Sequence, residues 1–113
     1  MDAQLYKSID ALHSLVALTS DPDNVPDRNV RSALKASIAI VRSAVEASDG
    51  INKVKAKRAL REMAGHVPHI CDRELAWDSR MIEIEALADD LSMFLEHVPA
   101  YAAARGIEVR TPE

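Results

Sequence analysis

Apolar residues recur along most of this chain at steps of three and four, the spacing that places side chains on one face of an α-helix. The first such segment ends near Thr19, and the second covers about 27 to 48. A shorter third segment covers about 51 to 64, and a fourth runs from about 70 to 97. The pattern therefore predicts a bundle of four main helices.

Residues that start or stop helices separate these segments. Positions 21–27 hold two prolines and several capping residue types, so we expect Asn24 or Asp27 to cap the second helix. Asp49-Gly50 supplies residue types that end it. Gly65-His66-Val67-Pro68 is expected to interrupt the third helix, because glycine and proline both disfavour helix interiors.

The C-terminal end is predicted to hold one further short helix. A proline suits the first turn of a helix and a glycine suits its end, and Pro99 and Gly106 have this arrangement. We expect a helix over 99–105, a single domain over 1–106 and a tail over 107–113, which has no capping or periodic signal.

The fourth segment carries the strongest periodic signal, an apolar stripe that keeps its spacing over three heptads. The members that we expect at an oligomer interface are Trp77, Met81, Ile84, Leu91, Leu95 and Val98. A helix of about 28 residues would be about 42 Å long. Because the other helices are expected to be shorter, part of this stripe is predicted to meet a second copy of the chain, most simply in a dimer.

Composition agrees with an all-α fold and also indicates in which cellular compartment the protein is expected. The chain is 48% apolar and 28% charged, with only four aromatic residues, which disfavours a sheet. Its single cysteine cannot form an intramolecular disulfide, and the polar N-terminus has no leader-like apolar run. Apolar runs of a few residues are too short to span a membrane. We expect a cytoplasmic protein.

Two short motifs occur at proline junctions of the chain. The first consists of Asp21-Pro22, Val25-Pro26, Asn29-Val30-Arg31 and Ala33, and the second of Arg73, Leu75 and Trp77. They resemble the signatures Asp-Pro-x-Val-Pro-x-Asn-Ile-Arg-x-Ala and Arg-x-Leu-x-Trp of a family of small, uncharacterised, mostly archaeal helical-bundle proteins. The resemblance is that of a distant relative over roughly residues 9 to 90. It implies a compact, often self-associating bundle and brings no established activity or cofactor.

A basic run in the third segment is the main candidate for binding an anionic partner. The net charge of −4 disfavours a general nucleic-acid binder, because neutralising phosphates supplies most non-specific affinity. Five cations nevertheless occur between 53 and 61 with no acid among them, including Lys55, Arg58 and Arg61. They could meet nucleic acid or an acidic protein, or they could be solvated or paired with acids of the fourth segment.

Arg28 and Arg31 are a second candidate for anion or partner binding. They fall in the first turn of the second helix, where the helix dipole disfavours cations. Such a placement needs compensation from Asp21, Asp23 or Asp27, or from a carboxylate of a partner.

Candidate chemistry is sparse. His66, His69 and Cys71 are soft ligands within six residues, but zinc needs a fourth ligand and no second Cys/His pair follows. Arg61 and His66 fit the Arg-x4-His spacing of helical ribonuclease toxins, although the flanking Gly65 and Pro68 predict that His66 lies at a helix junction. No phosphate-binding loop or metal-binding helix motif occurs, and no cofactor is expected.

The leading interpretation is a non-enzymatic protein that acts through protein-protein contacts and self-association along the fourth helix. The alternative is a nucleic-acid-associated factor that uses the basic third helix. A small enzyme with His66 at its active site is the third.

Overall fold

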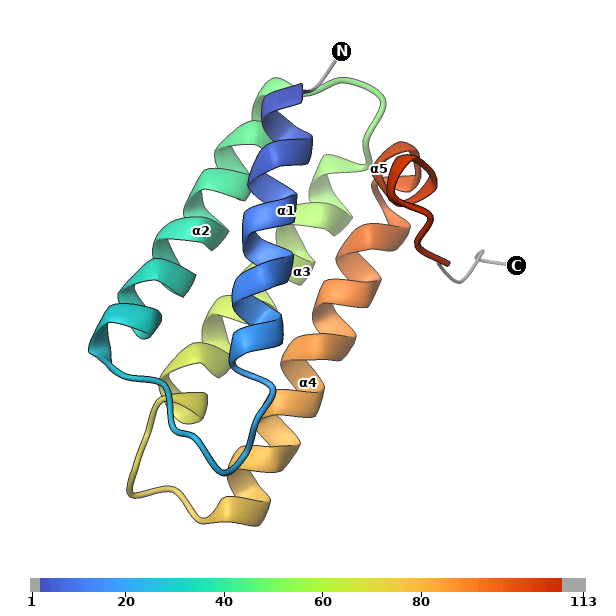
Figure 1. The fold of residues 1–113 in the computed structure, drawn as a ribbon. Coiled ribbons are helices and arrows are strands. Elements are labelled where there is room, and N and C mark those ends of the chain that lie inside the picture. Colours follow the sequence, from blue (N-terminus) through green and yellow to red (C-terminus); the bar gives the residue numbers. More distant parts are fainter. Residues whose placement is uncertain (1–2, 109–113) are drawn as a thin grey trace.

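The computed structural model describes residues 3–108, which fold into five helices (Figure 1). The helices are α1 (Ala3–Leu18), α2 (Arg28–Ala47), α3 (Lys53–Ile70), α4 (Trp77–Glu96) and α5 (Pro99–Arg105). No strand occurs within the described range, so the predicted all-α class is confirmed. No helix in this range is long and apolar enough to cross a membrane.

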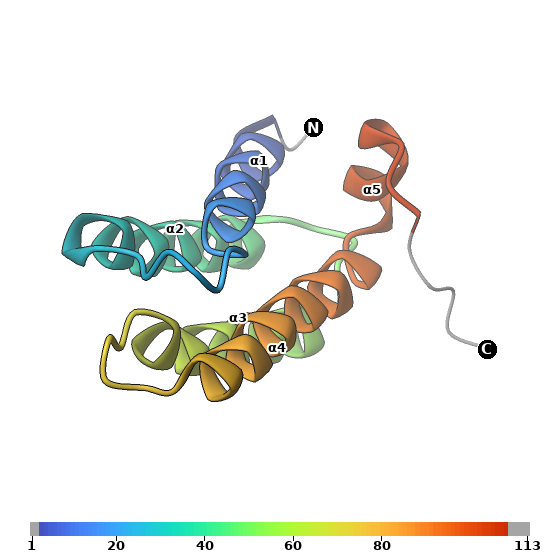
Figure 2. The same cartoon turned by 60° about the horizontal axis from the view of Figure 1, so that its bottom comes forward.

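The four long helices form a bundle of two layers, with α1 and α2 in one layer and α3 and α4 in the other (Figure 2). The pair α3 and α4 is the most closely packed, whereas α1 and α4 touch only slightly. The core between the layers is built from aliphatic side chains together with Met63, Phe94 and Tyr101. The sparse aromatic content of the sequence therefore corresponds to a core made mainly of Leu, Ile and Val.

The bounds of α1, α2 and α5 agree with the sequence pattern. Asp27 is the N-cap of α2, since its Oδ1 accepts a hydrogen bond from the Val30 N–H at 2.9 Å. Gly106 ends α5 with φ near 67°, a left-handed conformation that favours glycine. Of the predicted tail, Ile107 packs against the core, and the residues from 109 onward lie outside the described range.

The predicted interruption of the third helix is wrong, because α3 continues through Gly65 and Pro68 to Ile70. Val67 and Ile70 are fully buried, and the helical path places them on the same face as Met63. Burying two such side chains is worth about 3–6 kcal/mol. Pro68 lies within the last turn of α3, so its missing N–H removes one helical hydrogen bond near the end of the helix.

The predicted start of the fourth helix near residue 70 is also wrong. Residues 71–76 form a loop in which Asp72 Oδ1 accepts a hydrogen bond from the Glu74 N–H at 2.9 Å. The helix begins at Trp77 and has 20 residues, the same length as α2. Trp77 is 52% exposed, and its indole N–H donates to Asp23 at 3.2 Å. This hydrogen bond joins the start of α4 to the link between α1 and α2, and Trp77 lies outside the core.

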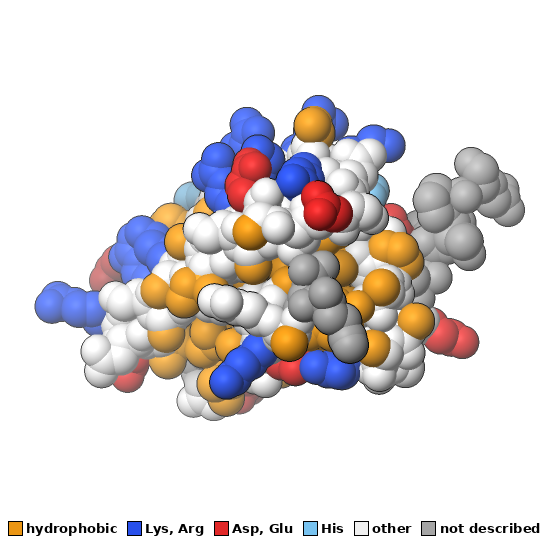
Figure 3. Space-filling view, turned by 90° about the horizontal axis from the view of Figure 1, so that it is seen from above, with side chains coloured by type: hydrophobic (Ala, Val, Ile, Leu, Met, Phe, Trp, Pro, Cys, Tyr) orange, Lys and Arg blue, Asp and Glu red, His pale blue; other side chains and the backbone are white. Residues whose placement is uncertain are grey.

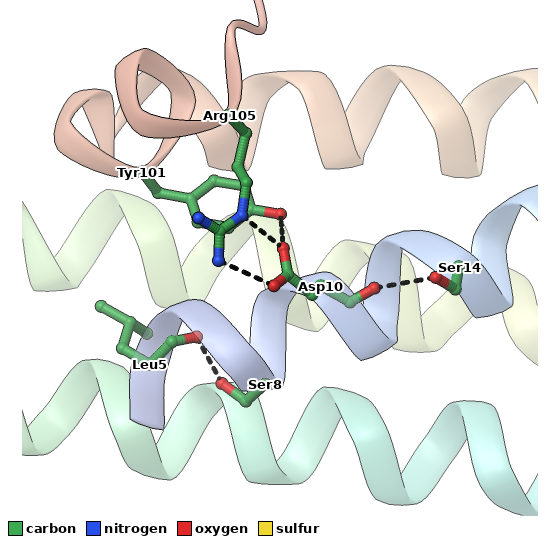
Figure 4. A network of polar contacts seen from close by, with 6 residues as sticks. All are labelled: Leu5, Ser8, Asp10, Ser14, Tyr101 and Arg105. Atoms are coloured by element: carbon green, nitrogen blue, oxygen red, sulfur yellow. Dashed lines mark hydrogen bonds and ion pairs between the residues drawn. The ribbon is translucent and has the colours of Figure 1, made fainter. Parts of the chain in front are cut away.

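The short helix α5 is fastened to α1 by a polar network around Asp10 (Figure 4). The Asp10 carboxylate accepts hydrogen bonds from the Arg105 guanidinium, at 2.8 and 3.0 Å, and from the Tyr101 hydroxyl, at 2.6 Å. These donors, Arg105 first, lower the pKa of Asp10 to about 2. Burial and the Asp10 charge raise the pKa of Tyr101 to about 12. Arg105 also lies over the rings of Tyr6 and Tyr101, so α5 has a fixed place beside α1.

Candidate functional site

Charge is divided unequally among the helices. Together α2 and α3 carry nine Lys and Arg residues against two Glu, whereas α4 carries six acidic residues and one Arg. The net charge of −4 therefore conceals a strongly basic pair of neighbouring helices. We call the exposed surface of this pair the α2–α3 basic face. Its cations are Arg28, Arg31, Lys35 and Arg42 on α2 and Lys53, Lys55, Lys57, Arg58 and Arg61 on α3, with Arg73 in the following loop.

The four cations of α2 lie on the edge of that helix that borders α3. Arg28, Arg31, Lys35 and Arg42 follow one another at steps of three, four and seven residues, which keeps them on one side of a helix. At one end of this edge, the charges of Arg31 and Lys35 act on the Cys71 thiol at the end of α3. The edge is therefore a row of cations along the boundary between the two helices.

At the other end of the boundary, a single acidic residue meets several cations. The Glu46 carboxylate forms an ion pair with Lys57, and the Glu46 carbonyl accepts a hydrogen bond from the Lys53 ammonium at 2.9 Å. The hydrogen bond from Lys57 is the main cause of the lowered pKa of Glu46, and Arg42 contributes as well. The single negative charge of Glu46 thus lies near three cations, so this end of the α2–α3 boundary has an excess of positive charge.

The predicted candidates Lys55, Arg58 and Arg61 are exposed on α3, and none of them forms an ion pair within residues 3–108. Pairing of these three with acids of the fourth helix is therefore absent, whereas their exposure agrees with the solvated alternative. Figure 3 looks onto the end where α3 begins, and most of the visible Lys and Arg side chains lie toward the α3 and α2 sides.

Arg28 and Arg31 are not compensated by the aspartates that were expected to neutralise them. Within the described residues, neither arginine forms an ion pair with Asp21, Asp23 or Asp27. The Asp27 carboxylate instead caps α2, and the Asp21 carboxylate accepts hydrogen bonds within the link before it. Both arginines remain open to an external anion.

The predicted oligomer stripe on the fourth helix is mostly covered by the chain itself. Ile84, Leu91, Leu95 and Val98 are buried in the core of the single chain, while Met81 is half-buried and Trp77 is exposed. With 20 residues, α4 is covered along its inner face by the other helices. The length argument for a second copy on this stripe is therefore lost, because the prediction overestimated the helix by about eight residues.

His66 lies on α3 and not at a junction, and it contacts two carboxylates of α4. Its Nδ1 lies 2.5 Å from Glu83 Oε2, and its Nε2 lies 3.1 Å from Asp90 Oδ2. Asp90 is buried, and this burial raises the pKa of its carboxyl group, with the neighbouring Glu62 adding to the rise. One ring nitrogen thus forms a hydrogen bond with Glu83 and the other lies close to the Asp90 carboxylate without hydrogen-bond geometry, so His66 bridges α3 and α4.

The structure does not bring His66, His69 and Cys71 together as a ligand set. His66 faces α4, His69 is exposed, and Cys71 lies beside Arg31 and Lys35 of α2. Within residues 3–108, no group of three or more His, Cys, Asp or Glu side chains has a geometry that could hold a metal ion.

Sequence reasoning overlooked three cations of the basic face, namely Lys35, Arg42 and Arg73. The helical spacing from Arg31 was a sufficient signal for Lys35 and Arg42. No periodic signal reaches Arg73, because it lies in the loop that was assigned to the fourth helix. Comparisons with family models, curated proteins and solved structures found no match to this chain.

Proposed function

We propose that this protein is a non-enzymatic nucleic-acid-binding protein whose α2–α3 basic face contacts the phosphate backbone of a double-stranded partner. The observation that carries the proposal is the excess of cations on two adjacent helices, nine Lys and Arg against two Glu, in a chain of net charge −4. A cation excess costs folding free energy through repulsion, so a segregated excess favours an anionic partner.

The face is better suited to nucleic acid than to a protein partner. Protein interfaces usually have an apolar core rich in aromatic side chains, whereas nucleic-acid interfaces are polar and strongly positive. On the outer side of α3, Val54 is the only large exposed apolar side chain among Lys, Arg, Glu and His. The helix α2 has 20 residues and spans about 30 Å, enough to follow roughly nine base pairs of a duplex.

The partner is expected to be a duplex and not a single strand. Single-stranded nucleic acids are usually held by aromatic side chains that stack on the bases. The aromatic residues Tyr6 and Tyr101 lie between α1 and α5, Phe94 is in the core, and Trp77 begins α4. None of them belongs to α2 or α3, so the contacts would be made to phosphates. We place this activity in the cytoplasm, the compartment favoured by a single unpaired cysteine.

The test is fluorescence anisotropy with 20-base-pair DNA and RNA duplexes at several salt concentrations. We expect binding that weakens steeply as salt increases, because bound counterions are released from the phosphates. Arg61→Glu should weaken binding about tenfold and reduce the salt slope by about one to two.

The matched control is Lys7→Glu, which makes the same charge change on the exposed surface of α1. It should change the affinity by less than about twofold. Absence of binding to either duplex at low salt, or equal losses for the two variants, would refute the proposal.

A further inference from the structure

We infer that the hollow between the start of α2 and the loop after α3 is a binding site for a phosphate monoester, the doubly charged group that ends a nucleic-acid strand. Its role at a strand end rests on the function proposed above, whereas its affinity for the monoester does not. The hollow has a volume of about 280 Å³. Its lining residues are Pro26, Asp27, Arg28, Arg31, Cys71 and Arg73.

Three arginines from two separate elements line this hollow. Arg28 and Arg31 come from the first turn of α2, and Arg73 comes from the loop between α3 and α4. Within residues 3–108, none of the three forms an ion pair. The only carboxylate in the lining belongs to Asp27, and one of its oxygens is engaged in capping α2. The hollow therefore has a net positive charge that no internal partner removes.

This arrangement is suited to a phosphate that has more than one free oxygen. A guanidinium group forms two parallel hydrogen bonds to neighbouring phosphate oxygens, and three such groups surround a tetrahedral anion better than one. A phosphate monoester has three terminal oxygens and nearly two negative charges at neutral pH, whereas a diester has two oxygens and one charge. The hollow is slightly smaller than the pockets of about 300–1,000 Å³ that enclose drug-sized ligands, which suits a small group.

Cys71 provides a direct reporter for this site, because it lines the hollow and is the only cysteine of the chain. Burial raises the pKa of its thiol, and the positive charges of Arg31 and Lys35 act in the opposite direction. A bound dianion would cancel these charges and cover the thiol. Because the thiolate is the reactive form, both effects would slow alkylation.

The first experiment measures the rate at which iodoacetamide alkylates Cys71 in the full chain, at constant pH and ionic strength. We expect phenyl phosphate to slow the reaction at least about threefold in a saturable manner, and dimethyl phosphate to have little effect. Arg73→Gln should abolish this protection, while the control Arg58→Gln, outside the hollow, should retain it. Circular dichroism would verify that both variants are folded. Absence of saturable protection, or full protection in Arg73→Gln, would overturn the inference.

The second experiment compares duplexes that carry a 5′-phosphate or a 5′-hydroxyl at their ends. We expect the 5′-phosphorylated duplex to bind about threefold more tightly, and this preference should vanish in Arg73→Gln. Equal affinity for both duplexes, together with loss of binding in Arg61→Glu, would reject the strand-end role and leave the proposed function intact. Protection of Cys71 by phenyl phosphate without duplex binding would support the monoester site and refute the proposed function.

Discussion

The two flanks of α3 differ in whether their polar side chains have partners inside the chain. On the flank that borders α4, the ring nitrogens of His66 lie close to the carboxylates of Glu83 and Asp90, so these polar groups have partners inside the chain. On the flank that borders α2, cations follow one another along both helices, and Glu46 is the only carboxylate that pairs with them in the described residues. The same helix therefore has one flank whose polar groups are partnered inside the chain and one flank on which most cations are not.

This difference separates structural charge from charge that is available to a partner. A polar side chain that already has a partner inside the chain gains little by binding a ligand, so its mutation mainly changes the stability of the fold. Cations without internal partners cost some stability through mutual repulsion, and an anionic ligand can remove that cost. We therefore expect variants on the α4 flank to affect folding and variants on the α2 flank to affect binding.

The largest effect is expected from Leu91→Asp, on the inner face of α4. Leu91 is buried in the core of the single chain. Truncating such a side chain typically costs about 2–5 kcal/mol, and burying a carboxylate adds to this. Since small domains are stable by about 5–15 kcal/mol, most of the helical circular dichroism signal should be lost.

The matched control for that change is Ile82→Asp, on the outer side of the same helix, where the side chain is 66% exposed. This variant should keep its helical signal and its melting temperature within a few degrees of the parent chain. Light scattering measures whether the chain is a monomer or a dimer and can contradict this prediction. A folded Leu91→Asp variant that is monomeric, beside a dimeric parent chain, would show that the stripe on α4 is an oligomer interface after all.

A smaller effect, an increase in stability, is expected from Asp90→Asn on the flank that borders α4. Burial raises the pKa of the Asp90 carboxyl, so the folded chain holds this proton more tightly than the unfolded chain. The associated stability is fully present at acidic pH and is lost as the pH rises through the folded pKa. Asp90→Asn removes this loss and should be up to about 1 kcal/mol more stable than the parent chain at pH 7.

Urea unfolding at pH 4 and pH 7 measures this difference. The advantage of Asp90→Asn should shrink toward pH 4, because the raised pKa makes the native Asp90 carboxyl more protonated there than at pH 7. Asp89→Asn is the control, because Asp89 is exposed and adjacent in sequence. A variant less stable than the parent chain at pH 7 would show that contact with His66 stabilises the Asp90 carboxylate more than burial destabilises it. The pKa of Asp90 would then not be raised.

The fold was predictable wherever periodicity and capping agreed. The apolar steps placed α1 and α2, Pro99 and Gly106 placed α5, and Asp27 was one of two expected caps for α2. The error arose at Gly65 and Pro68, because local residue preferences favoured a break while burial of Val67 and Ile70 favoured a continuous helix. A local signal was outweighed by packing that only the tertiary structure defines.

The candidate site was predictable in part for a similar reason. Exposed cations on a single helix follow from spacing, as with Arg58 and Arg61. The partners of His66 could not be found in this way, since Glu83 and Asp90 reach it only through the packing register of two helices. The place of Arg73 depends on a loop conformation that no periodicity describes.

The smallest effects come from two Lys→Gln changes on the α2 flank, and they should have opposite signs. Arg31 and Lys35 are four residues apart on one helix, an arrangement in which like charges destabilise by about 0.2–0.5 kcal/mol. Lys35→Gln should therefore raise the free energy of unfolding by about that amount at low salt. Lys57→Gln breaks the exposed ion pair with Glu46 and should lower it by up to about 1 kcal/mol.

Glutamine and lysine have nearly equal helix propensities, so the two changes differ mainly in the charges around them. Urea unfolding at 20 mM and 500 mM NaCl should show both differences shrinking at high salt, because screening weakens repulsion and attraction alike. If Lys35→Gln destabilised the chain at low salt, the Lys35 charge would already have an internal partner. The cations of the α2 flank would then have partners inside the chain, as the polar groups of the α4 flank do, and the argument for an external anion would be weakened at Lys35.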